Sequence, residues 1–150
     1  MIAPIMTEPG GPAWRQTIFH PFALTSRHAR GDVLRVEPVS PLYETARYGP
    51  VPVLDAVATW DDDTREAALF AVNRDRGQRL ALDVDVRALP VGAVRAALTL
   101  ADDDRAATNT AAQPERVVPL PNATVELTGG RLRVQLPPVS WTMVRLAATP

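Results

Sequence analysis

The sequence contains no cysteine, few aromatic residues and no long apolar run, and each absence excludes a class of protein. Without cysteine the chain can form neither a disulfide framework nor a thiolate metal site. No apolar run approaches the roughly 20 residues of a membrane-spanning helix, and Met1–Met6 is too short for the core of a signal peptide. The formal net charge of -1 gives no electrostatic reason to expect nucleic acid or a membrane as a partner. We therefore predict a soluble protein that suits a reducing compartment.

Apolar residues in alternation, separated by prolines, are what the sequence does contain. Hydrophobic residues make up 46% of the chain, enough for a sizeable core, and 15 of its 150 residues are proline. This combination favours short strands joined by stiff turns, and the adjacent Gly129 and Gly130 predict a hairpin tip. We predict strands within residues 32–39, 53–60, 66–73, 79–89, 93–100, 123–136 and 140–146. Their number and hairpins predict a mainly β fold, an antiparallel β-sandwich, to whose core the polar stretch 101–116 contributes little.

The first thirty residues follow a different pattern. Residues 2–8 form a short apolar stretch that predicts a buried strand, and Pro9-Gly10-Gly11-Pro12 predicts a turn after it. The spacing of apolar residues then predicts a helix over 17–30, with Pro21 in its first turn and Gly31 as its cap. Its shared face is formed by Ile18, Phe22, Ser26 and Ala29, with Phe19 beside them. The segment thus resembles one β/α unit, which could not be stable alone.

Candidate catalytic and metal-binding residues are few. His20 and His28 lie eight residues apart on the predicted helix, whereas a helical metal pair needs spacings of three or four. The two acidic runs 61–63 and 102–104 could supply oxygen ligands to calcium, but neither continues into an EF-hand pattern, so solvated turns are the favoured interpretation. The sequence contains no nucleophile elbow, phosphate-binding glycine loop or dinucleotide fingerprint. We predict no catalytic residue, no metal site and no cofactor.

The three tryptophans could stack on sugars. Trp60 and Trp141 lie in predicted strands, where a tryptophan more often packs in the core. Trp14 instead lies in the Pro/Gly-rich loop that follows a strand, and such loops line active sites in β/α architectures. Trp14 is therefore the one residue that we predict to bind substrate, with packing as the alternative.

Several strings, in order along almost the whole chain, resemble the α-L-arabinofuranosidases of glycoside hydrolase family 51. The opening resembles the end of the catalytic barrel in that family, and the later strings resemble its C-terminal domain. The strings are "IAPIMTEPGGPAWRQTIFHPFALTSRHARGDVL", "SPLYET", "VPVLDAVATW", "LFAVNRD", "ATNTAAQPERVVP" and "LPPVSWTMVRL". The co-linear order carries the resemblance, because any one string alone would be weak.

The resemblance implies a division of the chain into two parts. Residues 1–30 would be the last strand, loop and helix of a truncated (β/α)8 barrel, with 9–16 as the loop facing the active site. Residues 31–150 would be a C-terminal β-sandwich of the jelly-roll type. The two catalytic glutamates of this retaining family lie on earlier barrel strands, so neither has a counterpart here, and Glu8 matches neither. The chain alone is then expected to be a fragment without activity.

The same resemblance implies partners and a location. The parent enzyme would release terminal non-reducing α-L-arabinofuranosyl residues from arabinose-containing oligosaccharides in the cytoplasm, as a homo-oligomer, and this chain would pack against the remaining barrel. No nucleic acid or membrane is expected to bind. The alternative is a stand-alone carbohydrate-binding or oligomerisation module, which the sandwich fold permits.

Overall fold

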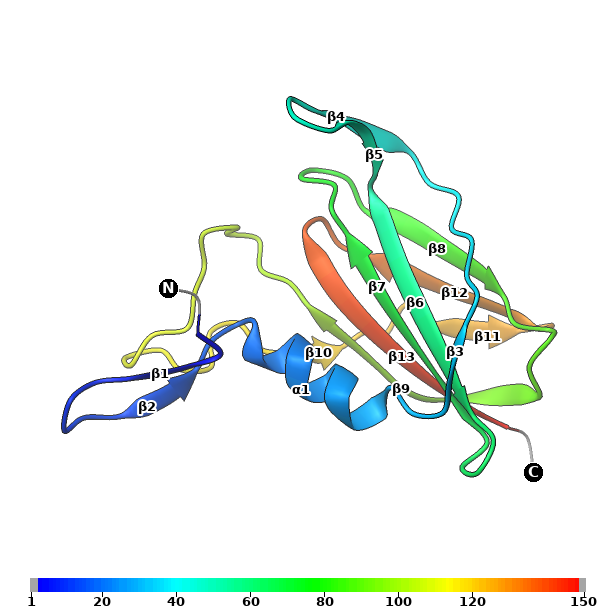
Figure 1. The fold of residues 1–150 in the computed structure, drawn as a ribbon, viewed down its shortest axis with the longest axis horizontal. Coiled ribbons are helices and arrows are strands. Elements are labelled where there is room, and N and C mark those ends of the chain that lie inside the picture. Colours follow the sequence, from blue (N-terminus) through cyan, green and yellow to red (C-terminus); the bar gives the residue numbers. More distant parts are fainter. Residues whose placement is uncertain (1–2, 149–150) are drawn as a thin grey trace.

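A computed structural model describes residues 3–148 of the chain, which form antiparallel β-sheets and one short helix near the N-terminus (Figure 1). The observed fold confirms the predicted antiparallel β-sandwich. Among the described residues, no helix has the length and apolar character needed to cross a membrane.

Two sheets form the sandwich. The larger has the strand order β10-β9-β13-β7-β6-β3, and the smaller has the order β11-β12-β8. All neighbouring strands within these sheets pair antiparallel. The strands of the larger sheet are β3 (Asp32–Leu34), β6 (Leu54–Asp61), β7 (Glu66–Asn73), β9 (Val91–Leu100), β10 (Leu120–Pro121) and β13 (Ser140–Ala148). Those of the smaller sheet are β8 (Leu80–Asp85), β11 (Glu126–Thr128) and β12 (Arg131–Leu136).

The main core lies between the two sheets and follows from strand alternation. Along β12, Leu132, Val134 and Leu136 are buried while the residues between them face outward. They contact the inward side chains of the larger sheet, such as Leu69 and Leu146, in one cluster. Burying a side chain of this size contributes about 1.5–3 kcal/mol. The sandwich is therefore held chiefly by these alternating apolar residues.

Glycine sets the turn that joins β11 to β12. Gly129 and Gly130 both have positive φ, 58° and 72°, which side chains with a Cβ rarely adopt. A Cβ on Gly130 would also lie 2.4 Å from the Cγ atom of Arg87. The predicted glycine hairpin is confirmed.

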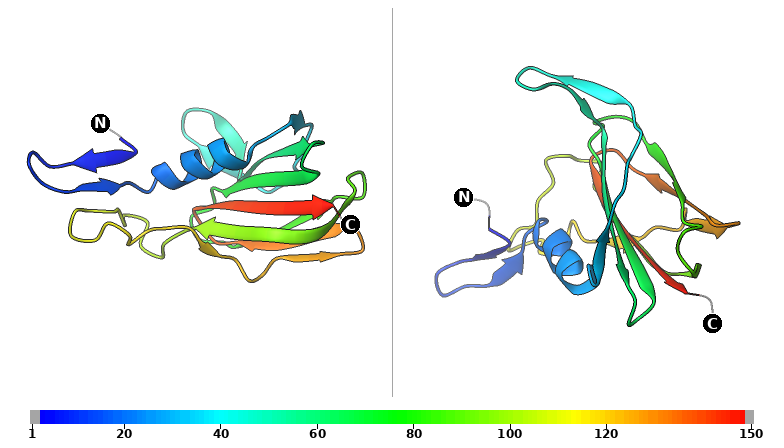
Figure 2. Two further views of the ribbon diagram at one scale, coloured as in Figure 1. Left: turned by 90° about the horizontal axis from the view of Figure 1, so that it is seen from below. Right: turned by 45° about the vertical axis from the view of Figure 1, so that its right-hand side comes forward.

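The opposite face of the larger sheet is covered in part by helix α1 (Phe19–His28). Figure 2 shows α1 on one side of this sheet and the smaller sheet on the other. Leu24 and Ala29 pack there against a second cluster that contains Phe70 and Met143. The molecule is thus layered as helix, sheet, sheet.

The predicted face of the helix is divided between solvent and the sandwich. Phe22 is 68% exposed and Ser26 is also exposed. Ala29, which was on that face, and Leu24, which was not, pack against the sandwich. The predicted cap needs correction. Gly31 lies beyond the C-cap residue, Ala29, and its φ of 72° serves a different purpose. A Cβ at Gly31 would lie 2.0 Å from the carbonyl oxygen of Trp60, so glycine lets the chain pass close to β6.

The segment before the helix is a hairpin, not a strand followed by an irregular loop. Strand β1 (Ile5–Thr7) pairs antiparallel with β2 (Ala13–Arg15), and Trp14 lies opposite Met6. The predicted strand over 2–8 is observed as the shorter β1, in which Ile5 is 51% exposed and which, within residues 3–148, pairs with β2 alone. Residue 2 lies outside the described part of the chain.

A second hairpin was not predicted at all. Among the described strands, β4 (Leu42–Thr45) and β5 (Gly49–Pro52) pair only with each other, and they project from the sandwich (Figure 1). Residues 35–41 lead to it without strand structure, so the predicted strand 32–39 is shortened to β3. The prolines at 38, 41, 50 and 52 explain both results, because proline removes a donor from any sheet ladder.

Candidate functional site

The tip of the β1–β2 hairpin is shaped by its proline and glycine residues. The backbone N–H of Glu8 donates to the carbonyl of Pro12 at 3.1 Å, and that of Gly11 donates to the carbonyl of Glu8 at 3.0 Å. Gly10 takes a positive φ of 68° within this turn. The turn reverses the chain, so Trp14 is placed on a strand, with its side chain half-buried.

Trp14 and Gln16 are both bound to one residue of a distant loop. The indole Nε1–H of Trp14 donates to the backbone carbonyl of Asn109 at 3.0 Å, and Nε2 of Gln16 donates to the same oxygen at 2.8 Å. The backbone N–H of Gln16 also donates to the carbonyl of Pro4 at 2.8 Å, which holds the base of the hairpin. The two side chains are therefore fixed relative to each other.

The side chain of Asn109 completes this arrangement. Its Nδ2 group donates to the carbonyls of Arg15 at 3.0 Å and Val117 at 3.1 Å, while its Oδ1 accepts the N–H of Val117 at 2.8 Å. Asn109 is only 1% exposed, so each polar atom needs such a partner. We call this arrangement of Trp14, Gln16, Arg15, Val117 and Asn109 the Asn109 junction.

The loop that carries Asn109 runs from 101 to 119, beside the hairpin (Figure 1). Arg116 pairs with Asp104 at 3.0 Å and with Asp102 at 3.8 Å, which closes the loop on itself. Residues 101–116 are polar, as expected, and they were expected to add little to the interior. Asn109 is buried nevertheless, and in the sequence it is marked only as a single asparagine in a polar stretch.

Next to the junction lies a pocket of about 330 Å³ on the face of α1. Its lining includes Arg15, Phe19, His20 and Leu98. The guanidinium of Arg15 lies 5.0 Å from the centre of the Phe19 ring, a cation–π distance, and His20 contacts the same ring edge-on. Burial, and then the charge of Arg15, lower the pKa of His20, whose Nε2 is buried without a hydrogen bond among the described residues.

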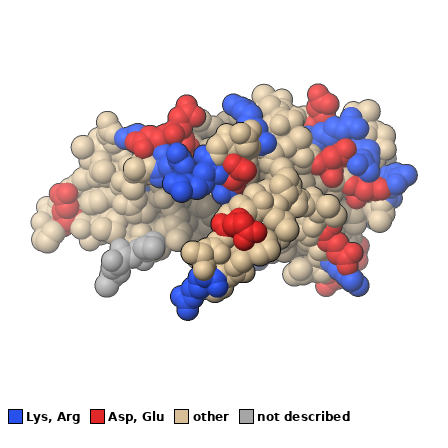
Figure 3. Space-filling view, turned by 90° about the horizontal axis from the view of Figure 1, so that it is seen from above, with Lys and Arg blue, Asp and Glu red and all other residues tan. Residues whose placement is uncertain are grey.

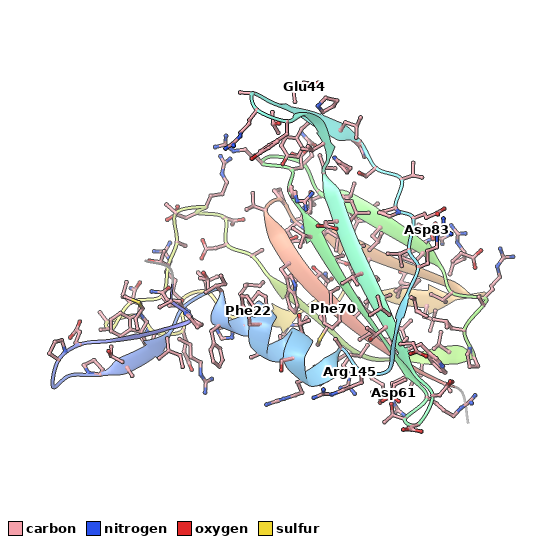
Figure 4. All side chains as sticks on the ribbon, in the orientation of Figure 1. Phe22, Glu44, Asp61, Phe70, Asp83 and Arg145 are labelled. Carbon is pink, nitrogen blue, oxygen red and sulfur yellow. The ribbon has the colours of Figure 1, made fainter. Side chains whose placement is uncertain are left out.

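A charged cluster lies at the other end of the helix. His28 shares a pocket of about 200 Å³ with Arg27, Arg30, Asp61 and Arg145, and Figure 4 shows Arg145 and Asp61 beside this end of α1. Arg145 also forms an ion pair with Glu66. Burial and then the charge of Arg145 lower the pKa of His28. The cluster lies where the C-terminal end of α1 meets the larger sheet.

The acidic runs lie at turns and make local hydrogen bonds there. The Oδ1 atom of Asp61 accepts the N–H of Asp63 at 3.0 Å, and that of Asp102 accepts the N–H of Asp104 at 2.8 Å. A hydrogen bond from Thr64 is the main cause of the lowered pKa of Asp61. Within residues 3–148, no group of three or more His, Cys, Asp or Glu side chains could hold a metal ion.

The two remaining tryptophans pack as predicted. Trp141 lies 6.0 Å from Phe70 between ring centres, in the cluster beneath α1. Trp60 packs at the margin of the main core.

Charged side chains occupy the outer face of the smaller sheet. Asp83 accepts hydrogen bonds from Arg131 at 3.0 Å and Arg133 at 3.4 Å, and Asp85 pairs with Arg87. The Arg131 hydrogen bond lowers the pKa of Asp83. Figure 3 shows basic and acidic groups mixed at this end of the molecule. A face of paired ions is solvated and does not provide the flat rings on which sugars stack.

Comparison with known proteins gives a consistent result over nearly the full chain. Residues 1–140 match the family described as alpha-L-arabinofuranosidase C-terminal domain. An intracellular exo-alpha-(1->5)-L-arabinofuranosidase of Streptomyces lividans is 49% identical over 147 residues, which are 98% of this chain and 22% of that protein. An exo-alpha-(1->6)-L-arabinofuranosidase of Bifidobacterium longum is 46% identical, over 97% of this chain and 28% of that protein.

Solved structures agree. A family 51 alpha-L-arabinofuranosidase from Bifidobacterium longum superposes with a TM-score of 0.90 at 44% identity, over 96% of this chain and 28% of that one. The family 51 arabinofuranosidase from Xanthomonas axonopodis pv. citri gives a TM-score of 0.84 at 26% identity, over 95% of this chain and 28% of that one. This chain therefore spans about a quarter of the length of its relatives, and it belongs to the family of C-terminal domains of glycoside hydrolase family 51 α-L-arabinofuranosidases.

Proposed function

We propose that this chain is the C-terminal part of an α-L-arabinofuranosidase that releases terminal non-reducing α-L-arabinofuranosyl residues with retention of configuration. The observation that carries the proposal is the match of residues 1–140 to the family, at 49% identity to a relative named for this activity. Because relatives are named for both the 1→5 and the 1→6 linkage, the proposal extends to arabinose-containing oligosaccharides and not to one linkage. The relatives named intracellular favour a cytoplasmic location.

Within such an enzyme, the role of this chain is structural and accessory. A retaining glycosidase needs two carboxyl groups about 5–5.5 Å apart. Glu8, at the edge of the hairpin turn, is exposed, and one carboxyl group cannot act both as nucleophile and as acid/base. We therefore assign the catalytic carboxylates to the remainder of the enzyme and expect the chain alone to be inactive.

The outward face of the first thirty residues supports a boundary near residue 30 between two domains. Phe22 and Ile5 are exposed apolar side chains on α1 and β1, and Figure 4 shows Phe22 on the helix away from the cluster around Phe70. Contiguous exposed apolar surface marks an interface, and we propose that these two side chains belong to one. The occupant that we propose is the rest of the catalytic barrel, of which β1 and α1 would be the final part.

Trp14 would then bind substrate. It follows β1 in the segment that the family resemblance places at the active-site face, and its ring is half-buried, with its N–H already bonded to Asn109. A half-exposed ring can still offer one face to a sugar. Stacking of flat ligands on aromatic rings is worth about 1–3 kcal/mol.

We also propose that the full-length enzyme is a homo-oligomer. The β4–β5 hairpin, which projects from the sandwich, carries the exposed apolar side chains Leu42 and Tyr48. The occupant proposed for this surface is a second copy. Light scattering should give a multiple of the monomer mass, and Tyr48→Glu with Leu42→Glu should reduce it; a monomeric full-length enzyme would refute the proposal.

A chimera tests the main proposal. The Streptomyces lividans relative would carry this chain in place of its own matching 147-residue segment. We expect the chimera to hydrolyse an aryl α-L-arabinofuranoside and the chain alone not to do so. A folded but inactive chimera would contradict the proposed function. Activity of the purified chain that disappears with Glu8→Gln would contradict its accessory role.

Phe22→Asp in the chimera tests the interface. If Phe22 packs against the barrel, the charge should be buried without a partner and should lower the melting temperature of the chimera. In the chain alone, where Phe22 is exposed, the same change should have little effect. Ser26→Asp, on the same exposed face, is a matched polar control. Equal effects of Phe22→Asp on chain and chimera would argue against the interface.

A further inference from the structure

The Asn109 junction connects two segments about 95 residues apart in sequence. On one side are Trp14, Arg15 and Gln16 of the hairpin, and on the other are Asn109 and Val117 of the loop 101–119. Among the described strands β2 pairs with β1 alone, so this junction is a separate attachment of the hairpin to the sandwich. Its geometry decides where the Trp14 ring lies.

Only an asparagine makes all of these contacts at this position. Its amide donates twice, to Arg15 and Val117, and accepts once from Val117. Aspartate has nearly the same shape but cannot donate when ionised, so two buried carbonyls would face a carboxylate. Alanine would leave the same carbonyls and one N–H without partners. In both variants the backbone carbonyl that accepts from Trp14 and Gln16 would lose its fixed position.

We propose that Asn109, in the sandwich, is a positioning residue for the sugar site. By holding its own backbone carbonyl in place, it orients the Trp14 indole for stacking on an arabinofuranosyl ring. This inference rests on the proposed function, in which Trp14 contacts substrate. It assigns part of substrate recognition to a loop of the domain that holds no catalytic group.

A matched control exists in the same sandwich. Asn73 is also fully buried, and its Nδ2 group donates to the carbonyls of Gln78, Leu136 and Pro137 at 2.9–3.1 Å. None of these groups belongs to the hairpin or to the loop 101–119. Asn73→Asp should therefore cause a comparable loss of stability without moving Trp14.

The first measurement uses the chain itself. The indole N–H signal of Trp14, assigned by its loss in Trp14→Phe, should show slow hydrogen exchange in the unmodified chain. Asn109→Asp should speed this exchange about tenfold or more and shift the signal, whereas Asn73→Asp should do neither. An unchanged Trp14 signal in a folded Asn109→Asp chain would overturn the inference, whatever the fate of the proposed function.

The second measurement is kinetic and uses the chimera. We expect Asn109→Asp to raise KM for the aryl arabinofuranoside about tenfold, corresponding to about 1.4 kcal/mol, with a smaller change in kcat. Trp14→Phe, which removes only the indole N–H and part of the ring, should raise KM in the same direction. Because both changes act through one contact, the double variant should be little worse than the poorer single variant.

The outcomes separate the two proposals. An inactive but folded unmodified chimera refutes the proposed function, while the indole signal still tests the junction. An active chimera in which Asn109→Asp behaves like Asn73→Asp, or in which the effects of Asn109→Asp and Trp14→Phe are additive, refutes the positioning role. If Asn109→Asp fails to fold, Trp14→Phe decides the matter, because an unchanged KM in that variant also refutes the role.

Discussion

The sandwich and the N-terminal hairpin-and-helix segment differ in how far their apolar side chains are buried. In the sandwich, residues such as Leu132 and Leu136 face another sheet and are completely buried. In the segment 3–30, Phe22 and Ile5 face outward, and contact with the sandwich is made by Leu24, Ala29 and the Asn109 junction. The sandwich is thus complete in its packing, whereas the segment is attached to it by one side only. The two regions of this chain therefore differ in how fully their apolar side chains are packed.

The largest effect should come from the sandwich core. Leu132→Ala should lower the free energy of unfolding by about 2–5 kcal/mol, because it leaves a cavity among closely packed neighbours. Phe22→Ala should change it far less, since that side chain is exposed in the chain alone. Urea unfolding of both variants measures the difference. Similar losses of unfolding free energy in the two variants would mean that the segment 3–30 is packed as tightly as the sandwich core. That result would contradict the difference described between the two regions.

The second-largest effect on stability should come from Gly31, where the N-terminal segment leads into the sandwich. Gly31→Ala forces a Cβ to within 2.0 Å of the Trp60 carbonyl at a φ of 72°, so the chain must shift where α1 leads into β3. Backbone strain of this kind costs about 1–3 kcal/mol. Gly49→Ala is the matched control, because it has a similar φ of 66° but nothing within 4 Å of the added Cβ. If both variants lose the same stability, the contact with Trp60 is not the cause of the loss.

The smallest effect should be a dependence on pH. The pKa of His28 is lowered in the folded chain, so the unfolded chain binds its proton more readily. Stability from this group is complete above the unfolded pKa of about 6.5 and is lost as pH falls through the lowered folded value. His20 acts in the same direction, because burial and Arg15 lower its pKa.

Melting curves from pH 7 to pH 5 would test this. We expect the melting temperature to fall, and the fall to be smaller in His28→Gln. Asp61, Asp83 and Asp85 also have lowered pKa values, but their contributions are lost only below the usual carboxylate range and do not affect this interval. A fall of the same size in a variant lacking both histidines would show that other groups are responsible.

Much of the sandwich could be predicted because alternation and turn residues act locally. Strand 66–73 was predicted with its observed bounds, and Gly129 and Gly130 located a hairpin. Strand β2 was not predicted because Ala13–Arg15 is too short to show alternation. The β4–β5 hairpin was not predicted because its prolines are typical of a loop.

The candidate site could be predicted only in part. Trp14 was noticed from its loop, but its partners were not, since Asn109 lies about 95 residues further along the chain and no local pattern connects them. The helix face was predicted from spacing alone, which identifies an apolar stripe but not which of its residues are packed. Within that stripe Phe22 is exposed, whereas Ala29 packs against the sandwich.

Hydrogen exchange of the chain alone tests most directly whether the segment 3–30 is a part of another domain attached to a complete sandwich. We predict slow exchange across β7, β12 and β13, which have strand partners on both sides. We predict fast exchange across Ile5–Thr7, whose one partner among the described strands is β2. The measurement requires a sample shown to be monomeric, because self-association through Phe22 could itself slow exchange. Exchange across Ile5–Thr7 as slow as in β7 in such a monomer would contradict the account.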